Sequence, residues 1–304
     1  MATALGPIET TRVAIRNILY LTDFSAPSEA ALPFAASIAR GYGAAIHGLH
    51  VLLPEAMSYA TPETLALAMD AQDEYARIEK QRLESQLAGI AHDVSIVRDV
   101  SVWHAVEEAL RSCSADMIVL GTHGRTGAQK LLLGSIAEDI FRRSPVPVLT
   151  IGPSTRTGVH NAGHFHCVLY ATDFSPQSLA AAPFAVSLAQ ENRARLVLFH
   201  AITESEREHG AAGAASAVDS ATHKLESIVP QGTELSSKPV TMLGYGEPAH
   251  RILQVARENH ADLIVLGVRD LGGHTGAATH LGRAVAHQVV AHAVCPVLTV
   301  RGQE

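Results

Sequence analysis

The sequence predicts two tandem α/β domains, each built on a doubly wound parallel sheet of the Rossmann-like kind. The chain has 304 residues, which suits about two domains at ~100–200 residues each. The segment beginning at Asn17, NILYLTDFSAPSEAALPFAASIA, recurs at Cys167 as CVLYATDFSPQSLAAAPFAVSLA, so the halves are copies of one unit. Within each copy, short apolar runs alternate with longer helical stretches, which is the order of an α/β fold.

The two copies are joined by a segment that has no apolar periodicity. The sequence from Gly152 to Gly163, GPSTRTGVHNAG, is rich in glycine, serine, threonine and proline, as linkers and loops are. We therefore expect a first domain at 1–152, a linker at 153–163 and a second domain at 164–304.

The strands are expected at short, continuous runs of Ile, Val and Leu, which are typical of strands buried on both faces of a parallel sheet. These runs are NILYL, AIHGLHV, VSIVRD, DMIVLG and VPVLTI, then VLYAT, RLVLFH, KPVTML, DLIVLG and CPVLTV. Helical patterns lie between them at 28–40, 62–88, 104–112, 135–143, 178–190, 218–228 and 248–259. Right-handed crossovers would then place helices on both faces of each sheet.

Composition excludes several classes of protein. Hydrophobic residues make up 47% of the chain and the net charge is −7, which argues against a disordered chain and against general attraction to nucleic acid or anionic lipid. Three widely spaced cysteines make a disulfide framework improbable and favour a reducing compartment. No signal peptide or membrane-spanning run is evident, so we expect a cytoplasmic protein without a membrane or nucleic-acid partner.

Ligands of doubly wound sheets bind outside the carboxyl ends of strands, at the point where the strand order reverses. The loop Leu21-Thr22-Asp23 directly follows the first strand. The Asp23 carboxylate can accept hydrogen bonds from a ribose hydroxyl or an adenine amine. Aspartate after a strand is commonly a turn or cap residue, so this residue alone favours a structural role over ligand binding. Val51 ends the second strand, a position from which it could press on a purine face.

The loop after the fourth strand is the strongest feature of the chain. Gly121-Thr122-His123-Gly124 is followed, after nine residues, by Gly134-Ser135 and an amphipathic helix. Glycines let backbone N–H groups approach an anion without a Cβ in the way, and a helix N-terminus attracts negative charge. The pattern therefore favours phosphate binding.

These residues together resemble the universal stress protein family, specifically its ATP-binding branch, whose mark is Gly-x2-Gly-x9-Gly-(Ser/Thr). The matching segments are YLTDFS, LHV and GTHGRTGAQKLLLGSIAEDIFRRSPVPVLTI. The resemblance spans the first copy and, with weaker motifs, the second, and it implies a tandem protein that binds one ATP, with Mg²⁺, in the first domain. The implied set is Asp23 for the adenosine, Leu21 and Val51 for the base, Gly121, Gly124, Gly134 and Ser135 for the phosphates, His123 and Arg125 flanking them, and Thr22, Leu120 and Ile136 beside them.

The second copy departs from this pattern. Asp270 stands where the second glycine is expected, and Arg283 replaces the hydroxyl before the helix. A Cβ and a negative charge near the phosphate position oppose ATP, so we expect an empty or altered site there. Asp173 is retained, and Arg269 and Arg283 could bind a differently placed anion, which leaves a different ligand open.

Two functional classes remain. The resemblance favours a nucleotide-dependent stress-response sensor or regulator that acts through an unknown protein partner. The alternative is a slow ATPase or nucleotidyl-transferring enzyme that uses His123 or Asp23. No catalytic residue or metal-binding side chain is assigned, because the sequence shows no positioned base or nucleophile pair. A nucleotide-free dimerisation scaffold is disfavoured by the intact glycine motif.

The last strand of each copy bears on assembly. A terminal strand commonly lies at a sheet edge, and unpaired edges are liabilities. We expect the runs at 146–151 and 295–300 to pair antiparallel within the chain and so to form a pseudo-dimer, as single-copy relatives pair across a two-fold axis by resemblance. Any further homodimer would use another surface.

Overall fold

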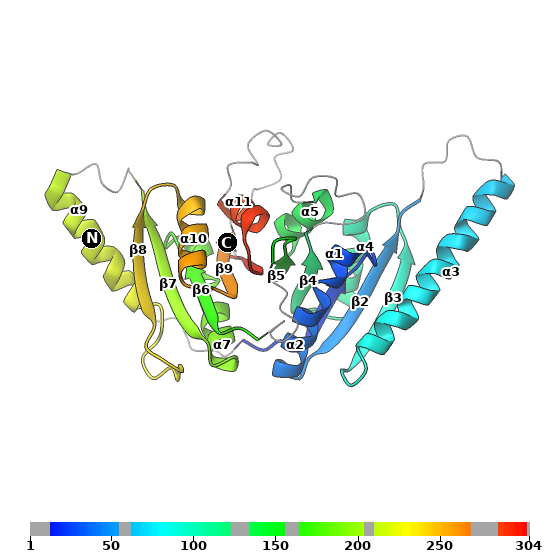
Figure 1. Ribbon diagram of the computed structural model, residues 1–304, viewed down its shortest axis with the longest axis horizontal. Coiled ribbons are helices and arrows are strands. Elements are labelled where there is room, and N and C mark those ends of the chain that lie inside the picture. Colours follow the sequence, from blue (N-terminus) through cyan, green and yellow to red (C-terminus); the bar gives the residue numbers. More distant parts are fainter. Residues whose placement is uncertain are drawn as a thin grey trace.

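The computed structural model describes residues 13–54, 62–122, 134–155, 164–203, 210–268 and 285–302. Its strands form a single ten-stranded sheet in the order β3-β2-β1-β4-β5-β10-β9-β6-β7-β8 (Figure 1). The strands of the first half are β1 (Asn17–Leu21), β2 (Ala45–Leu52), β3 (His92–Arg98), β4 (Met117–Gly121) and β5 (Val148–Ile151). Those of the second half are β6 (Cys167–Ala171), β7 (Arg195–Ile202), β8 (Val240–Tyr245), β9 (Leu263–Val268) and β10 (Val297–Arg301).

Every strand pairing within a half is parallel, and helices cover both faces of each half-sheet, so the predicted fold class is confirmed. The helices of the first half are α1 (Ala26–Glu29), α2 (Leu32–Tyr42), α3 (Pro62–Gln86), α4 (Val102–Ser112) and α5 (Ser135–Arg143). Those of the second half are α6 (Pro176–Leu179), α7 (Ala182–Glu191), α9 (Gly210–Glu226), α10 (Pro248–Glu258) and α11 (Val285–His292). Figure 1 shows α3 and α9 at the two outer ends of the molecule and β5 at its centre.

The core consists of two apolar layers, one on each face of the sheet. Because successive strand residues point to opposite faces, Ile18 and Tyr20 lie in one layer and Leu19 and Leu21 in the other. The first layer includes side chains from α2, α3, α7 and α9, whereas the second includes side chains from α4, α5, α10 and α11. Burial on both faces explains why the strands are continuous apolar runs in the sequence.

Three helical predictions need correction. The helix expected at 28–40 is two helices, α1 and α2, because Pro33 near the start of α2 has no amide hydrogen to continue the hydrogen-bond ladder. Pro183 divides α6 from α7 in the same way. α9 begins at Gly210, earlier than the expected 218. The added residues are rich in alanine, which has a high intrinsic helix propensity, but they lack the apolar periodicity on which the prediction relied. α11 is the helix expected after Arg283.

The two halves join through β5 and β10, which pair antiparallel with Leu149 opposite Leu298, as predicted. Both leucines are almost fully buried. Two threonine hydroxyls add cross-strand bonds, from Thr150 Oγ1 to the Val297 carbonyl at 3.1 Å and from Thr299 Oγ1 to the Val148 carbonyl at 3.3 Å. One chain is therefore a pseudo-dimer whose two sheets are continuous.

The strand order also determines where a ligand can bind. In the first half the chain runs from β1 outward to β2 and β3, then returns to the other side of β1 for β4 and β5. The order reverses between β1 and β4, and the equivalent reversal in the second half lies between β6 and β9. The crevices outside the carboxyl ends of these strand pairs are the expected ligand sites.

The β5–β10 pairing can be tested by cutting the chain. A protease site inserted between positions 156 and 163 should, once cleaved, leave both halves in one particle, because the paired strands hold them. Leu149→Lys with Leu298→Lys should separate the cleaved halves and enlarge the radius of gyration of the uncut chain, since buried unpaired charges cost several kcal/mol. Size-exclusion chromatography and small-angle scattering measure both outcomes. An unchanged radius in the double variant would mean that other contacts hold the halves together.

Candidate functional site

A cavity of about 500 Å³ lies at the reversal point of the first half, between the carboxyl ends of β1, β2 and β4 and the start of α5. It brings together nine residues of the expected site, which are Leu21, Thr22, Asp23, Val51, Leu120, Gly121, Gly134, Ser135 and Ile136. The remaining three, His123, Gly124 and Arg125, lie outside the described residues. Residues from four separate stretches of chain thus share one cavity, of a size typical for small-molecule sites.

The loop after β1 is held in a tight turn. The Thr22 amide donates to the Leu49 carbonyl at 3.1 Å, and Thr22 Oγ1 accepts from the Phe24 amide at 2.9 Å. This bond supports Phe24 in the left-handed region, at φ 60°, a conformation that non-glycine residues rarely adopt. Asp23 Oδ1 accepts from the Ser25 amide at 3.0 Å while the residue lines the cavity. The turn and ligand interpretations of Asp23 are therefore compatible.

A buried polar cluster lies beneath this turn. The Tyr20 hydroxyl donates to the Ser28 carbonyl at 2.9 Å, and burial raises the pKa of the Tyr20 phenol well above its usual range, so the group stays protonated and keeps donating. His50 Nδ1 lies 2.8 Å from the Thr22 carbonyl, which makes that nitrogen the donor. The His50 ring packs on Phe24 with centroids 4.5 Å apart. His50 therefore positions the loop that carries Asp23.

The same cluster recurs in the second half. Tyr170 donates to the Ser178 carbonyl at 2.7 Å, and His200 Nδ1 lies 2.8 Å from the Thr172 carbonyl. The His200 and Phe174 rings are again 4.5 Å apart, and Phe174 again has a φ of 60°. The repeated histidine at the end of the second strand thus has a structural role in both halves.

The other end of the first cavity is a helix N-terminus. α5 starts at Ser135, and Gly134 precedes it as an N-cap with φ −62° and ψ 140° that has no side chain to bond the first amides. The Gly134 amide itself donates to the Thr122 carbonyl at 2.8 Å. Ser135 is therefore the first helical residue rather than the cap. The first-turn amides and the helix dipole favour an anion at this end of the cavity.

Gly121 owes its identity to packing rather than to anion approach alone. A Cβ at this position would lie 2.6 Å from the Pro27 carbonyl oxygen and 3.0 Å from the Ser28 Cα. The equivalent Gly267 meets the Gln177 carbonyl oxygen at 2.3 Å. Glycine is thus needed at the end of this strand in both halves, whether or not a phosphate binds, and it does not distinguish the two sites.

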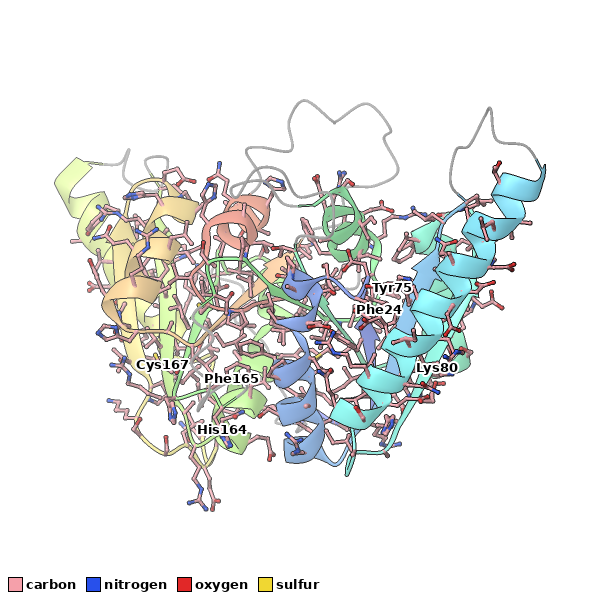
Figure 2. The ribbon with its side chains drawn as sticks, turned by 45° about the vertical axis from the view of Figure 1, so that its right-hand side comes forward. Phe24, Tyr75, Lys80, His164, Phe165 and Cys167 are labelled. Atoms are coloured by element: carbon pink, nitrogen blue, oxygen red, sulfur yellow. The ribbon has the colours of Figure 1, made fainter. Side chains whose placement is uncertain are left out.

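Two residues of α3 that the sequence analysis did not predict also line the cavity. Gln72 and Tyr75 lie one turn apart on the inner side of this helix. The Tyr75 ring is 41% exposed and approaches Phe24 edge-on with centroids 6.5 Å apart, an adjacency visible in Figure 2. Their sequence signal is only an amphipathic helix, which does not say what the helix covers. Leu49, Leu53 and Val102 complete the apolar wall.

The described residues were compared with what a metal site and a membrane-spanning helix require. Within it, no cluster of three or more His, Cys, Asp and Glu side chains could hold a metal ion, and no helix is both long and apolar enough to cross a bilayer. Cys113, Cys167 and Cys295 are free thiols.

A tandem pair of doubly wound α/β domains, each with a cavity at its strand-order reversal, is the class of protein that the fold defines. The universal stress protein family model matches residues 14–152 and 164–301. The chain therefore belongs to the universal stress protein family and carries two of its domains.

Several relatives share this family. A universal stress protein of Mycolicibacterium smegmatis is 28% identical over 305 residues, which covers 94% of this chain and 97% of that protein. One of Thermus aquaticus is 35% identical over 139 residues, which covers 45% of this chain and 99% of that protein. The crystal structure of a universal stress protein from Archaeoglobus fulgidus matches with a TM-score of 0.67 at 22% identity, covering 94% of this chain and 97% of that one. The last match shows the shared two-domain fold.

The packing role of Gly121 has a measurable consequence. Gly121→Ala should lower the free energy of unfolding by about 1–3 kcal/mol, because the new methyl group must displace the backbone at Pro27 and Ser28. Gly41→Ala is the matched control: its Cβ would meet nothing within 4 Å inside α2, so it should stabilise by about 0.5–1 kcal/mol. Chemical denaturation compares the two. If the Gly121→Ala and Gly41→Ala variants were equally stable, steric crowding would not explain why position 121 is glycine.

Proposed function

We propose that the first domain binds one ATP, with Mg²⁺, and that occupancy of this site regulates a stress response through a partner protein. The observation that carries the proposal is the convergence of nine of the expected ligand-binding residues on one cavity, with an acceptor carboxylate at one end and a helix N-terminus at the other. Membership of the universal stress protein family supports the stress-response role. The free cysteines suit a cytoplasmic location.

The cavity supplies matching surroundings for each part of the nucleotide. Leu21 and Val51 provide an apolar wall for the base, and the exposed Tyr75 ring lies beside it. The Asp23 carboxylate is the acceptor for a ribose hydroxyl or the adenine amine. The phosphates would lie at the α5 N-terminus beside Gly134 and Ser135.

Mg²⁺ fits this site as a companion of the phosphates rather than as a protein-bound metal. Asp23 is the single carboxylate among the described lining residues, and Mg²⁺ commonly keeps several waters while it bridges phosphate oxygens. When bound, the ion would neutralise phosphate charge. The chain's own contribution is the helix N-terminus and the Ser135 hydroxyl.

A regulatory role is favoured over fast catalysis. The titratable groups of the described lining are Asp23, His50 and Tyr75. Asp23 and His50 already make structural hydrogen bonds, to Ser25 and to the Thr22 carbonyl, and the Tyr75 ring approaches Phe24 edge-on. Fast phosphoryl transfer needs a residue that orients the attacking water. The alternative is a slow ATPase or nucleotidyl-transferring enzyme that uses His123 or Asp23. The regulatory proposal also includes a protein partner and a homodimer that forms through a surface other than the β5–β10 pairing.

Steady-state turnover separates these two roles. The regulatory role predicts ATP hydrolysis far below the ~1–100 per second typical of kinases, and no change in that rate in His123→Ala. Released phosphate, measured with purified protein, tests this expectation. Turnover in the kinase range that is lost in His123→Ala would establish the enzyme instead.

Asp23→Asn tests the adenosine end of the site. Asparagine keeps an Oδ1 acceptor for the Ser25 amide but loses the charge and one acceptor, so ATP should bind about tenfold or more weakly, with little change in melting temperature. Asp173→Asn makes the same change in the second domain, where Asp173 bonds Ser175 in the same way, and should leave ATP affinity unchanged. Titration calorimetry measures both. Equal losses in the two variants would argue against a first-domain site.

Ser135→Asp tests the phosphate end. A carboxylate in the first helical turn suits the helix dipole, so the fold should be retained, but it should repel phosphates and weaken ATP binding by tenfold or more. Adenosine, which has no phosphates, should bind as well as to the native protein. Ser101→Asp places the same charge at the N-cap of α4, outside the cavity lining, as a control. Parallel losses for ATP and adenosine would contradict this orientation of the nucleotide.

A further inference from the structure

A second cavity, of about 690 Å³, lies at the strand-order reversal of the second half. It is walled by the carboxyl ends of β6, β7 and β9 and by α10 and α11. Its apolar lining residues are Phe141, Ala171, Phe199, Ala201, Pro248, Ile252, Leu266, Val268, Val285 and Ala286. The cavity is larger than the first one and falls within the size range of ligand sites.

Two equivalent wall positions carry smaller side chains in the second cavity, whereas a third, Leu49 in the first cavity, is Phe199 in the second. Leu21 pairs with Leu49 and Leu120 in the first half, and Ala171 occupies the same place between β7 and β9 in the second. Val51, at the end of β2, is likewise replaced by Ala201 at the end of β7. Both alanines line the second cavity, as Leu21 and Val51 line the first. The second cavity is therefore wider at the two positions where Leu21 and Val51 line the first.

The first domain contributes a wall to the second cavity. Phe141 and Arg142, at the C-terminal end of α5, line it. The described lining of the first cavity, in contrast, comes from the first domain alone and ends at Ala137, at the N-terminal end of the same helix. A ligand in the second cavity would therefore contact both domains, across the seam that β5 and β10 form.

The described charges near this seam do not favour a polyanion; Arg269, Asp270 and Arg283 lie outside the described residues. Glu138 lies between two basic side chains, with Oε1 3.6 Å from Arg142 Nη1 and Oε2 3.8 Å from His287 Nε2. Its carboxylate offsets the positive charge of Arg142 at the cavity wall. At the other end Asp173 adds a negative charge. The described walls thus have no net positive charge that would attract a chain of phosphates.

We propose that the second cavity is a separate binding site for an uncharged, mainly apolar small molecule, wider than adenosine, held between the two domains. Binding would rest on burial of apolar surface, and the Asp173 carboxylate would accept one hydrogen bond from the ligand. This site differs in ligand class from the ATP site proposed for the first domain and does not depend on it.

N-phenylnaphthylamine is a suitable probe, because it is uncharged, consists of a naphthalene and a phenyl ring joined by one N–H donor, and fluoresces more strongly in apolar surroundings. The full chain should bind one probe molecule saturably. Ala171→Leu with Ala201→Val places the first-domain side chains in the second cavity and should weaken probe binding at least tenfold. ATP affinity, measured in the same variant, should not change.

The reverse exchange is the matched control. Leu21→Ala with Val51→Ala removes the same number of carbon atoms from the first cavity and should leave probe binding at the second site intact. Ala201→Val alone adds only two carbon atoms and should still weaken the probe severalfold, which covers the case in which the double variant does not fold. Absence of saturable binding to the native chain would overturn the proposal. So would equal probe affinity in the native chain and in folded Ala201→Val and double variants.

Discussion

The parallel pairing of β1 with both β2 and β4 is the constraint on which the rest of this structure depends. β1 has a strand at each edge and helices over both faces, so it is fully enclosed, and the chain must leave its carboxyl end in a loop that neither neighbouring strand covers. The turn at Thr22 and Asp23 fills that place, and the strand's apolar side chains divide between the two core layers. The second half repeats this arrangement around β6.

The polar cluster beneath the turn makes the loop a rigid part of the site. A hydroxyl from Tyr20 and a ring nitrogen from His50 bond the backbone on either side of Asp23. Buried hydrogen bonds of this kind are costly to leave unmade, so they favour one loop conformation. The repetition of the cluster in the second half shows that the scaffold was kept while the cavity walls changed. Ala171 and Ala201 are the clearest examples of such change.

The antiparallel seam makes one molecule of two similar domains. A ten-stranded sheet passes through it without interruption, and Arg301 of the second domain bonds the Arg143 carbonyl at the end of α5. α5 is nine residues long, or about 13 Å at 1.5 Å per residue, and its two ends reach different cavities. The two cavities are thus neighbours along one helix.

The amino-acid sequence by itself determined the repeated unit, the buried strands, the Asp23 loop, the helix that starts at Ser135 and the pairing of the terminal strands. All but the last are recorded in neighbouring residues, through side-chain periodicity, turn chemistry or a helix start. The strand pairing was expected from the edge position of the terminal strands and from the family resemblance. Only the tertiary structure decided that Gln72 and Tyr75 reach the first cavity, that Phe141 and Arg142 reach the second, and that Gly121 packs against Pro27. These contacts join segments distant in the chain, and their partners depend on how whole helices pack on the sheet, which no local pattern specifies.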